Sequence, residues 1–288
     1  MIIRLPKRPF VNGDRFPYLL MSDLHVGAAD CEKDLIRDDL KWAKKHGARV
    51  FIAGDVFDLL LPKDHKRYNP SRLDRELQGK DAVFNTALDL GSKLLKPYAD
   101  LIDMIGCGNH ETAITKFHSA DITSLLVERL STAKHKVVHG GYTGAIIQSF
   151  RHKSGNGCQW TVWYHHGIGG AAAVTRGMID FNRFASYVRN ADLLWCGHKH
   201  YRWVSNAREL RIPERGGEMY SKDVLHCMTG AYTGDGIEQI DEEGNYLTDW
   251  SREKGFAPAG RGGIRLWVTP FRSRANNRIW VPRMEAVV

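Results

Sequence analysis

Five short blocks of the chain carry side chains that can bind divalent metal ions. They are Asp23-Leu24-His25, Gly54-Asp55-Val56-Phe57-Asp58, Gly108-Asn109-His110-Glu111, His165-His166-Gly167 and Gly197-His198-Lys199-His200. Asp, Asn and His are side chains that hold first-row divalent metals. The set suits two ions that share one carboxylate, an arrangement that cleaves phosphate esters by in-line displacement.

The two ions divide the side chains between them. Asp55 is expected to bridge them, because a bridge needs a carboxylate with two ligand oxygens. The coordination of one ion is expected to be completed by Asp23, His25 and His200. That of the other is expected to be completed by Asn109, His198 and one of His165 and His166. Two such ions, about 3.5–4 Å apart, lower the pKa of a shared water. We expect Mn²⁺ first, and Fe, Zn or Ni also suit these ligands.

Each block follows a short apolar segment that is predicted to be a strand. Predicted strands cover residues 17–22, 49–53, 101–106, 159–164 and 191–196, and predicted helices cover 31–46, 73–96 and 178–189. This alternation indicates an α/β fold with parallel strands, whose ligands bind beyond the carboxyl ends of the strands. A β-hairpin is predicted from 137–138 and 142–150, a loop at 230–263, and late strands at 263–270 and 278–281.

In order, the blocks DLH, GDVFD, GNHE, HHG and GHKH resemble the signature of the calcineurin-like metallophosphoesterase superfamily, over about residues 17–200. That signature is DxH, GDxxD, GNH[DE], a histidine after a strand, and GHxH. The resemblance implies a four-layer α/β/β/α sandwich of the metallophosphoesterase type with a di-metal site. It also implies that His110 is the acid that protonates or stabilises the leaving-group oxygen, and that Glu111 orients His110.

The resemblance also bears on the doublet that follows the fourth predicted strand. In relatives the metal ligand directly follows the strand, which favours His165 over His166. His166 and Asp58 are then expected to contact the substrate or the metal ligands.

Length and composition indicate one soluble domain. The 288 residues are expected to form a single domain, with the motifs in 17–200 and a basic C-terminal extension, 201–288, of unassigned role. Five cysteines without CxxC spacing indicate free thiols in a reducing compartment. Without an apolar run of transmembrane or signal-peptide length, we expect a cytoplasmic protein with no membrane partner. The sequence gives no indication of an oligomeric state.

The charge distribution suggests a polyanionic substrate. The formal net charge is +8, from 41 basic and 33 acidic residues. Residues 61–80 are rich in Lys and Arg, and we expect Lys66, Arg67 and Arg72 to contact nucleic acid. The basic tail carries Trp267 and Trp280, which could stack on bases.

The sequence therefore predicts a metal-dependent phosphodiesterase or nuclease acting on DNA or RNA. A phosphomonoesterase or small-nucleotide phosphodiesterase, in which the basic patches are incidental, stays open as the alternative. A non-catalytic scaffold is disfavoured, because a scaffold has no need of Asn109 beside His110.

Overall fold

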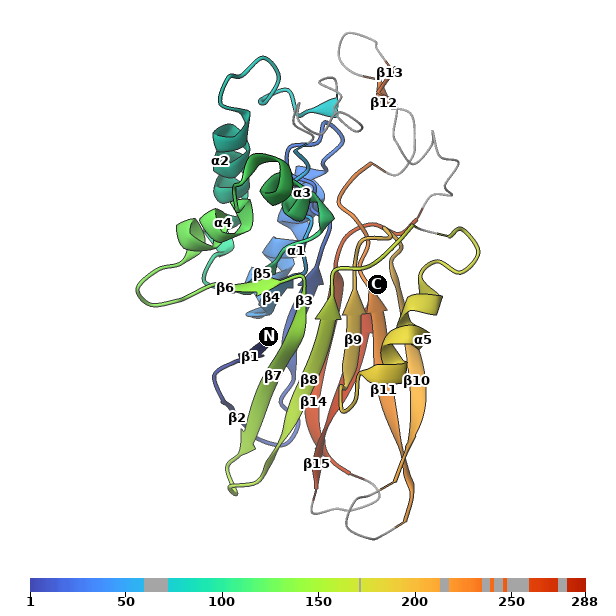
Figure 1. Cartoon of the computed structure of the whole chain (residues 1–288). Helices are drawn as coiled ribbons and strands as arrows, with labels where there is room; N and C mark the ends of the chain where they lie inside the picture. Colours follow the sequence, from blue (N-terminus) through green and yellow to red (C-terminus); the bar gives the residue numbers. More distant parts are fainter. Residues whose placement is uncertain are drawn as a thin grey trace.

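The computed structural model describes residues 1–59, 72–170, 172–212, 218–234, 239–240, 246–247, 259–273 and 279–288. Two β-sheets lie face to face, with helices on their outer sides (Figure 1). In these ranges no helix is long and apolar enough to cross a membrane.

The first sheet has six strands and carries most of the helices. Its order is β15 (Trp280–Val287), β14 (Ile264–Arg272), β3 (Phe16–Met21), β4 (Arg49–Ile52), β5 (Ile102–Gly106) and β6 (Val138–Gly141). The helices are α1 (Lys33–His46), α2 (Val83–Leu95), α3 (Asn109–His118) and α4 (Ile122–Leu130), and a 3₁₀ turn, η2 (Lys96–Tyr98), follows α2. Strands β3 to β6 are parallel, so their carboxyl ends lie at one edge.

The second sheet has seven strands. Its order is β1 (Ile2–Arg4), β7 (Thr143–His152), β8 (Gly157–His165), β9 (Leu193–Cys196), β11 (Tyr220–Met228) and β10 (Trp203–Arg211), with β2 (Arg8–Phe10) also beside β7. Helix α5 (Met178–Tyr187) lies on its outer face. A separate two-stranded pair consists of β12 (Gln239–Ile240) and β13 (Tyr246–Leu247).

Three apolar cores separate four layers. Residues of α1, α2 and α4 pack on the outer face of the first sheet. Between the sheets, Tyr18 and Phe51 meet Trp160 and Trp195. On the far side, Phe181 and Phe184 of α5 pack on the outer face of β9 and β11. The four-layer α/β/β/α architecture expected from the sequence is confirmed by these contacts.

Two predicted elements differ from the structure. The helix predicted at 73–96 begins only at Val83, because Leu73 pairs with Ala28 and the Asp74 N–H donates to the Gly27 carbonyl. The predicted hairpin at 137–150 is wrong, because β6 and β7 belong to different sheets. Gly141, with φ +64°, turns the chain from one sheet to the other, and the hairpin is β7–β8 instead.

The C-terminal region, to which the sequence assigned no role, supplies strands to both sheets. Strand β14 pairs antiparallel with β3, the strand that precedes Asp23. The buried carboxylate of Asp39 on α1 accepts hydrogen bonds from the Tyr232 hydroxyl (2.7 Å) and the Arg265 guanidinium (3.0 Å). Most of the predicted loop 230–263 lies outside the described ranges.

Of the two tail tryptophans, Trp280 is only 5% exposed and lies in the core between the sheets. The expectation that it stacks on bases is therefore wrong. Trp267 packs against Trp42 and under the Arg15 guanidinium.

Candidate metal centre

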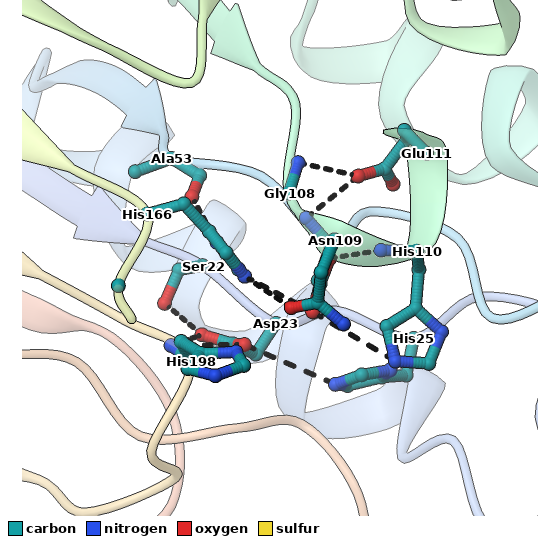
Figure 2. A network of polar contacts seen from close by, with 12 residues as sticks. Ser22, Asp23, His25, Ala53, Gly108, Asn109, His110, Glu111, His166 and His198 are labelled. Atoms are coloured by element: carbon teal, nitrogen blue, oxygen red, sulfur yellow. Dashed lines mark hydrogen bonds and ion pairs between the residues drawn. The ribbon is translucent and has the colours of Figure 1, made fainter. Parts of the chain in front are cut away.

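The five motif blocks meet where the carboxyl ends of the strands of the two sheets come together. Asp23 follows β3, Asp55 follows β4, and Asn109 begins α3 just after β5. His166 follows β8 and His198 follows β9 in the other sheet. Figure 2 shows the side chains of Asp23, Asn109, His166 and His198 gathered at one place, and Asp55 Oδ2 lies 3.1 Å from His166 Nε2, so that segments distant in sequence build one centre.

The backbone at this centre is conformationally unusual. Among the described residues, eight non-glycine residues have positive φ, and five of them are predicted metal ligands. These five are Asp23 (+55°), His25 (+51°), Asp55 (+48°), His198 (+70°) and His200 (+57°). Such conformations cost on the order of 1–3 kcal/mol each and cluster at functional sites. The fold therefore holds the ligand residues in conformations that most side chains avoid.

Glycines in the motifs allow the ligand loops to approach closely. A Cβ on Gly108 would overlap the Asp55 carboxylate, and one on Gly197 would overlap the side chains of Ser22 and Asp23. The glycines of the GNH and GHxH blocks are therefore needed for space around the two aspartates.

Asp23, His25 and His200 form the first group of donor atoms. The Nε2 atoms of His25 and His200 are 3.2 Å apart, and His200 Nε2 lies 3.6 Å from Asp23 Oδ1. Two nitrogens bound to one ion at about 2.0–2.1 Å in tetrahedral geometry lie about 3.3 Å apart. The spacing of this group therefore fits one cation.

Asp23 is oriented by groups that sequence reasoning missed. The Ser22 hydroxyl donates to Asp23 Oδ2, and the backbone N–H of His198 donates to the same oxygen (2.9 Å). Ser22 Oγ lies 2.6 Å from Thr229 Oγ1, which accepts a hydrogen bond from Trp195 Nε1 (3.1 Å). The position of Ser22 directly before Asp23 is a sequence signal that could have identified it. No motif or spacing in the sequence identifies Thr229.

Asp55, His166 and His198 form the second group, and Asn109 adjoins it. His166 Nε2 lies 3.1 Å from Asp55 Oδ2 and 3.2 Å from Asn109 Oδ1. His166 Nδ1 is 2.8 Å from the Ala53 carbonyl, and His198 Nε2 is 2.8 Å from the Gly169 carbonyl. Each ring can donate one N–H to the backbone and keep its other nitrogen as a neutral donor, as metal-binding histidines do.

The second group contains His166 where the sequence favoured His165. Side chains alternate along a strand, and Trp160, Val162 and Tyr164 of β8 face the core between the sheets. His165 therefore points to the other side, where its ring stacks on Phe184. His166 continues toward the core side and reaches Asp55. The assignment of His165 as the ligand is corrected to His166 for this reason.

Asp58, rather than Glu111, contacts the His110 side chain. His110 Nδ1 lies 3.0 Å from Asp58 Oδ1, and Asp58 Oδ2 lies 3.5 Å from His25 Nδ1. Glu111 is buried and accepts hydrogen bonds from the backbone N–H groups of Asp55 (3.0 Å), Phe57 (2.9 Å) and Gly108 (2.7 Å). Its carboxylate therefore joins two ligand loops instead of orienting the imidazole.

The carboxylates dominate the electrostatics of the centre. Burial disfavours the His110 imidazolium, but Asp58 and Asp55 outweigh it and raise the His110 pKa to about 10. Burial opposes ionisation of Asp55, yet His166 and His110 keep its pKa well below the usual range. The Asp55 charge acts on His25 and His200 of the first group as well as on His166. The Asp55 charge thus affects the pKa values of histidines in both groups.

The donor set fits two divalent cations. His25, Asp58 and His110 form a third cluster of possible donors, in which the buried His25 Nδ1 and Asp58 Oδ1 lack well-aligned hydrogen-bond partners. Burial also lowers the pKa of His200 to about 4, so its ring is neutral and able to donate a lone pair. Carboxylate, amide and imidazole donors together suit first-row divalent ions.

The basic residues predicted to contact nucleic acid are only partly described. Lys66 and Arg67 lie outside the described residues. Arg72 is half-buried, and its carbonyl accepts a hydrogen bond from the Ala29 N–H (2.9 Å). On the other side of the segment, the Asp58 N–H donates to the Val26 carbonyl (3.0 Å). Asp58 and Arg72, on the two sides of residues 60–71, therefore both lie beside the segment 26–29, which directly follows His25.

Comparison with known proteins gives matches among solved structures. No family profile matches the chain, and no curated protein does. The calcineurin-like phosphoesterase YfkN from Bacillus subtilis is similar, with 10% identity, a TM-score of 0.41, and coverage of 94% of this chain and 90% of that chain. A predicted phosphoesterase from Streptococcus pneumoniae has 10% identity, a TM-score of 0.30, and coverage of 95% and 99%. Chaetomium thermophilum Vps29 has 10% identity, a TM-score of 0.32, and coverage of 94% and 95%.

The description of the architecture therefore comes from the two sheets of this structure, and that of the chemistry comes from the geometry of the centre.

The close approach of Gly108 to Asp55 gives a testable prediction. Gly108→Ala should displace the Asp55 carboxylate and reduce bound Mn²⁺ from two ions per chain to fewer than one, as measured by elemental analysis after dialysis. Gly170→Ala is the matched control, because a Cβ there meets nothing within 4 Å. Full metal content in Gly108→Ala would show that the loops tolerate a methyl group at this contact.

Proposed function

We propose that the chain is a two-metal hydrolase of phosphate esters. The observation that carries the proposal is the pair of donor groups, one of them containing Asp55, with the His110 imidazole beside Asp55. His110 Nε2 lies 3.9 Å from Asp55 Oδ2, whereas its Nδ1 faces Asp58. The imidazole therefore presents one nitrogen to the centre and uses the other to hold its orientation.

The two ions would supply Lewis acidity at the phosphoryl oxygens and a water of lowered pKa. We propose Mn²⁺ first, and Fe, Zn or Ni also suit these mixed oxygen and nitrogen donors. Protonated His110 would donate the Nε2 proton to the leaving oxygen, and Asp58 would stabilise the imidazolium that carries it. Ser22 and the His198 amide would keep Asp23 in place, and Glu111 would hold the loops of Asp55 and Asn109.

Two substitutions should separate proton transfer from metal binding. His110→Asn should lower the turnover of bis-p-nitrophenyl phosphate by about 10²–10⁴ while bound metal stays at the wild-type level. Asp55→Asn should abolish turnover and weaken the binding of both ions, because Asp55 is the one proposed bridging ligand. Turnover and metal content are measured on the same samples. Loss of metal in His110→Asn would make His110 a ligand instead of the acid.

Asp58 should set the pH range of activity. Its negative charge raises the His110 pKa, so Asp58→Asn should lower it. An acid acts only while protonated, and its contribution is lost as the pH rises through its pKa. The alkaline limb of the kcat profile should therefore move to lower pH in Asp58→Asn, with the metal content measured in parallel. A limb that stays in place would remove Asp58 from this role.

We further propose that the substrate is a phosphodiester in DNA or RNA. The net charge of +8 favours a polyanion. Lys66 and Arg67 belong to a segment whose flanking residues lie beside 26–29, next to the ligand His25. Arg72, the described residue of the three, lies on this flank, and a basic residue at this position favours a phosphodiester substrate.

Charge removal should test this substrate class. Replacing Lys66, Arg67 and Arg72 by alanine should flatten the slope of log K against log salt by about 0.7–0.9 for each phosphate that these side chains neutralise. The control replaces Lys93, Lys134 and Lys136, three exposed residues near the opposite edge of the first sheet, and changes the net charge equally. Turnover of p-nitrophenyl phosphate without turnover of any diester would favour a phosphomonoesterase instead.

A further inference from the structure

A continuous strip of aromatic rings leads away from the metal centre. It consists of Tyr142, His165, Phe184, Trp163 and Tyr187, and we call it the aromatic strip. The Tyr142 ring lies 5.4 Å from that of His166 and 5.2 Å from that of His165, measured between centroids. The remaining links are His165–Phe184 (5.2 Å), Trp163–Phe184 (4.7 Å) and Trp163–Tyr187 (6.3 Å). The strip thus begins in contact with the proposed ligand His166.

The strip is only partly covered by the fold. Phe184 is fully buried and supports the other rings, whereas Tyr142, Trp163 and His165 are half-buried. Tyr187, at the end of α5, is 58% exposed. The rings of Trp163 and His165 lie nearly parallel, at 29°. An open row of this kind offers flat surfaces on which other planar groups can stack.

Helix α5 fixes the direction of the strip relative to the metal centre. Lys199, which lies between His198 and His200, forms a buried ion pair with Asp180 in the first turn of α5 (2.5 Å). The amino-terminal end of α5 is therefore attached to the ligand loop, on the outer face of the second sheet (Figure 1). Tyr187, two turns further on, marks the far end of the strip.

Positive charge accompanies the rings. Arg183 is exposed and lies one turn before Tyr187, on the same face of α5, where its charge acts on the Tyr187 hydroxyl. Arg176, which is also exposed, precedes the helix. Aromatic rings interleaved with basic side chains are the features with which proteins bind single-stranded nucleic acid.

We propose that the aromatic strip binds the bases of a single-stranded nucleic acid whose phosphodiester lies at the metal centre. The inference rests on the proposed function and narrows its substrate class. Rings would stack on unpaired bases, and Arg183 would contact a backbone phosphate. A duplex fits this surface less well, because its bases are paired and stacked on one another. The charge of Arg183 beside Tyr187 favours a nucleic acid over an apolar protein segment.

Binding is measured separately from cleavage. A labelled single-stranded oligothymidylate is titrated with the full-length protein at low salt in EDTA, and fluorescence anisotropy gives the Kd. Tyr187→Ala should weaken binding roughly 5- to 150-fold, the effect of removing one base–aromatic stack, and Tyr187→Phe should bind like wild type. Tyr220→Ala is the matched control, because Tyr220 is 50% exposed on β11, away from the strip, and should leave Kd unchanged.

The charge is tested in the same way. Arg183→Ala should reduce the salt slope by about 0.7, while Arg208→Ala, a change of equal charge on β10, should not. Wild-type affinity in Tyr187→Ala overturns the proposal. So does duplex DNA that binds as tightly as the single strand and is weakened equally by Tyr187→Ala.

A small substrate separates the two proposals. If the wild type hydrolyses bis-p-nitrophenyl phosphate with Mn²⁺ but does not bind the single strand, this inference fails and the proposed function stands. If it hydrolyses no phosphate ester, the proposed function fails, and the EDTA titration still decides whether the strip binds a strand.

Discussion

The hydrogen bonds to the buried carboxylate of Glu111 are the interactions on which the geometry of the candidate metal centre depends most. This carboxylate accepts backbone hydrogen bonds from Asp55 and Phe57 in the loop after β4, and from Gly108 in the loop after β5. These amides would otherwise be buried without partners, since Asp55, Phe57 and Gly108 are all buried. One side chain thus sets the distance between the loop of Asp55 and the start of α3. That distance in turn brings the His110 N–H within 2.9 Å of Asp55 Oδ1.

The remaining loops support one another in the same manner. The Asp23 N–H donates to the Gly54 carbonyl (3.0 Å), and the His25 N–H donates to the Asp55 carbonyl (3.1 Å). The Asp23 carbonyl accepts from the Tyr232 N–H (2.9 Å), in a segment that Asp39 holds through the Tyr232 hydroxyl. Such bonds compensate for the left-handed backbone at the ligands and fix the donor atoms before any ion arrives.

The sequence predicted the parts of the site that depend on local pattern. Residue types and strand ends placed Asp23, Asp55, Asn109 and the GHKH histidines, because a parallel sheet brings its carboxyl ends together. The choice between His165 and His166 depended on which face of β8 meets the first sheet. In that strand Trp160, Val162 and Tyr164 alternate with Gln159, Thr161 and Trp163, which favours His166, but the prediction rested on the position directly after the strand. The hydrogen-bond partners of Glu111 could not be predicted either. They are backbone N–H groups, which every residue except proline has, so residue types do not reveal them.

The position of β14 has a consequence for how the molecule is made. Strand β3 pairs with β4 close in sequence, but its other edge pairs with β14, so that Leu20 meets Ile264. During synthesis that edge stays open until β14 has emerged, although all the proposed ligand residues, up to His200, are already present. An open apolar strand edge is a site of aggregation, and a pairing so distant in sequence forms slowly. A chain shortened before β14 would thus retain every proposed metal ligand and still lack the strand that pairs with the second edge of β3.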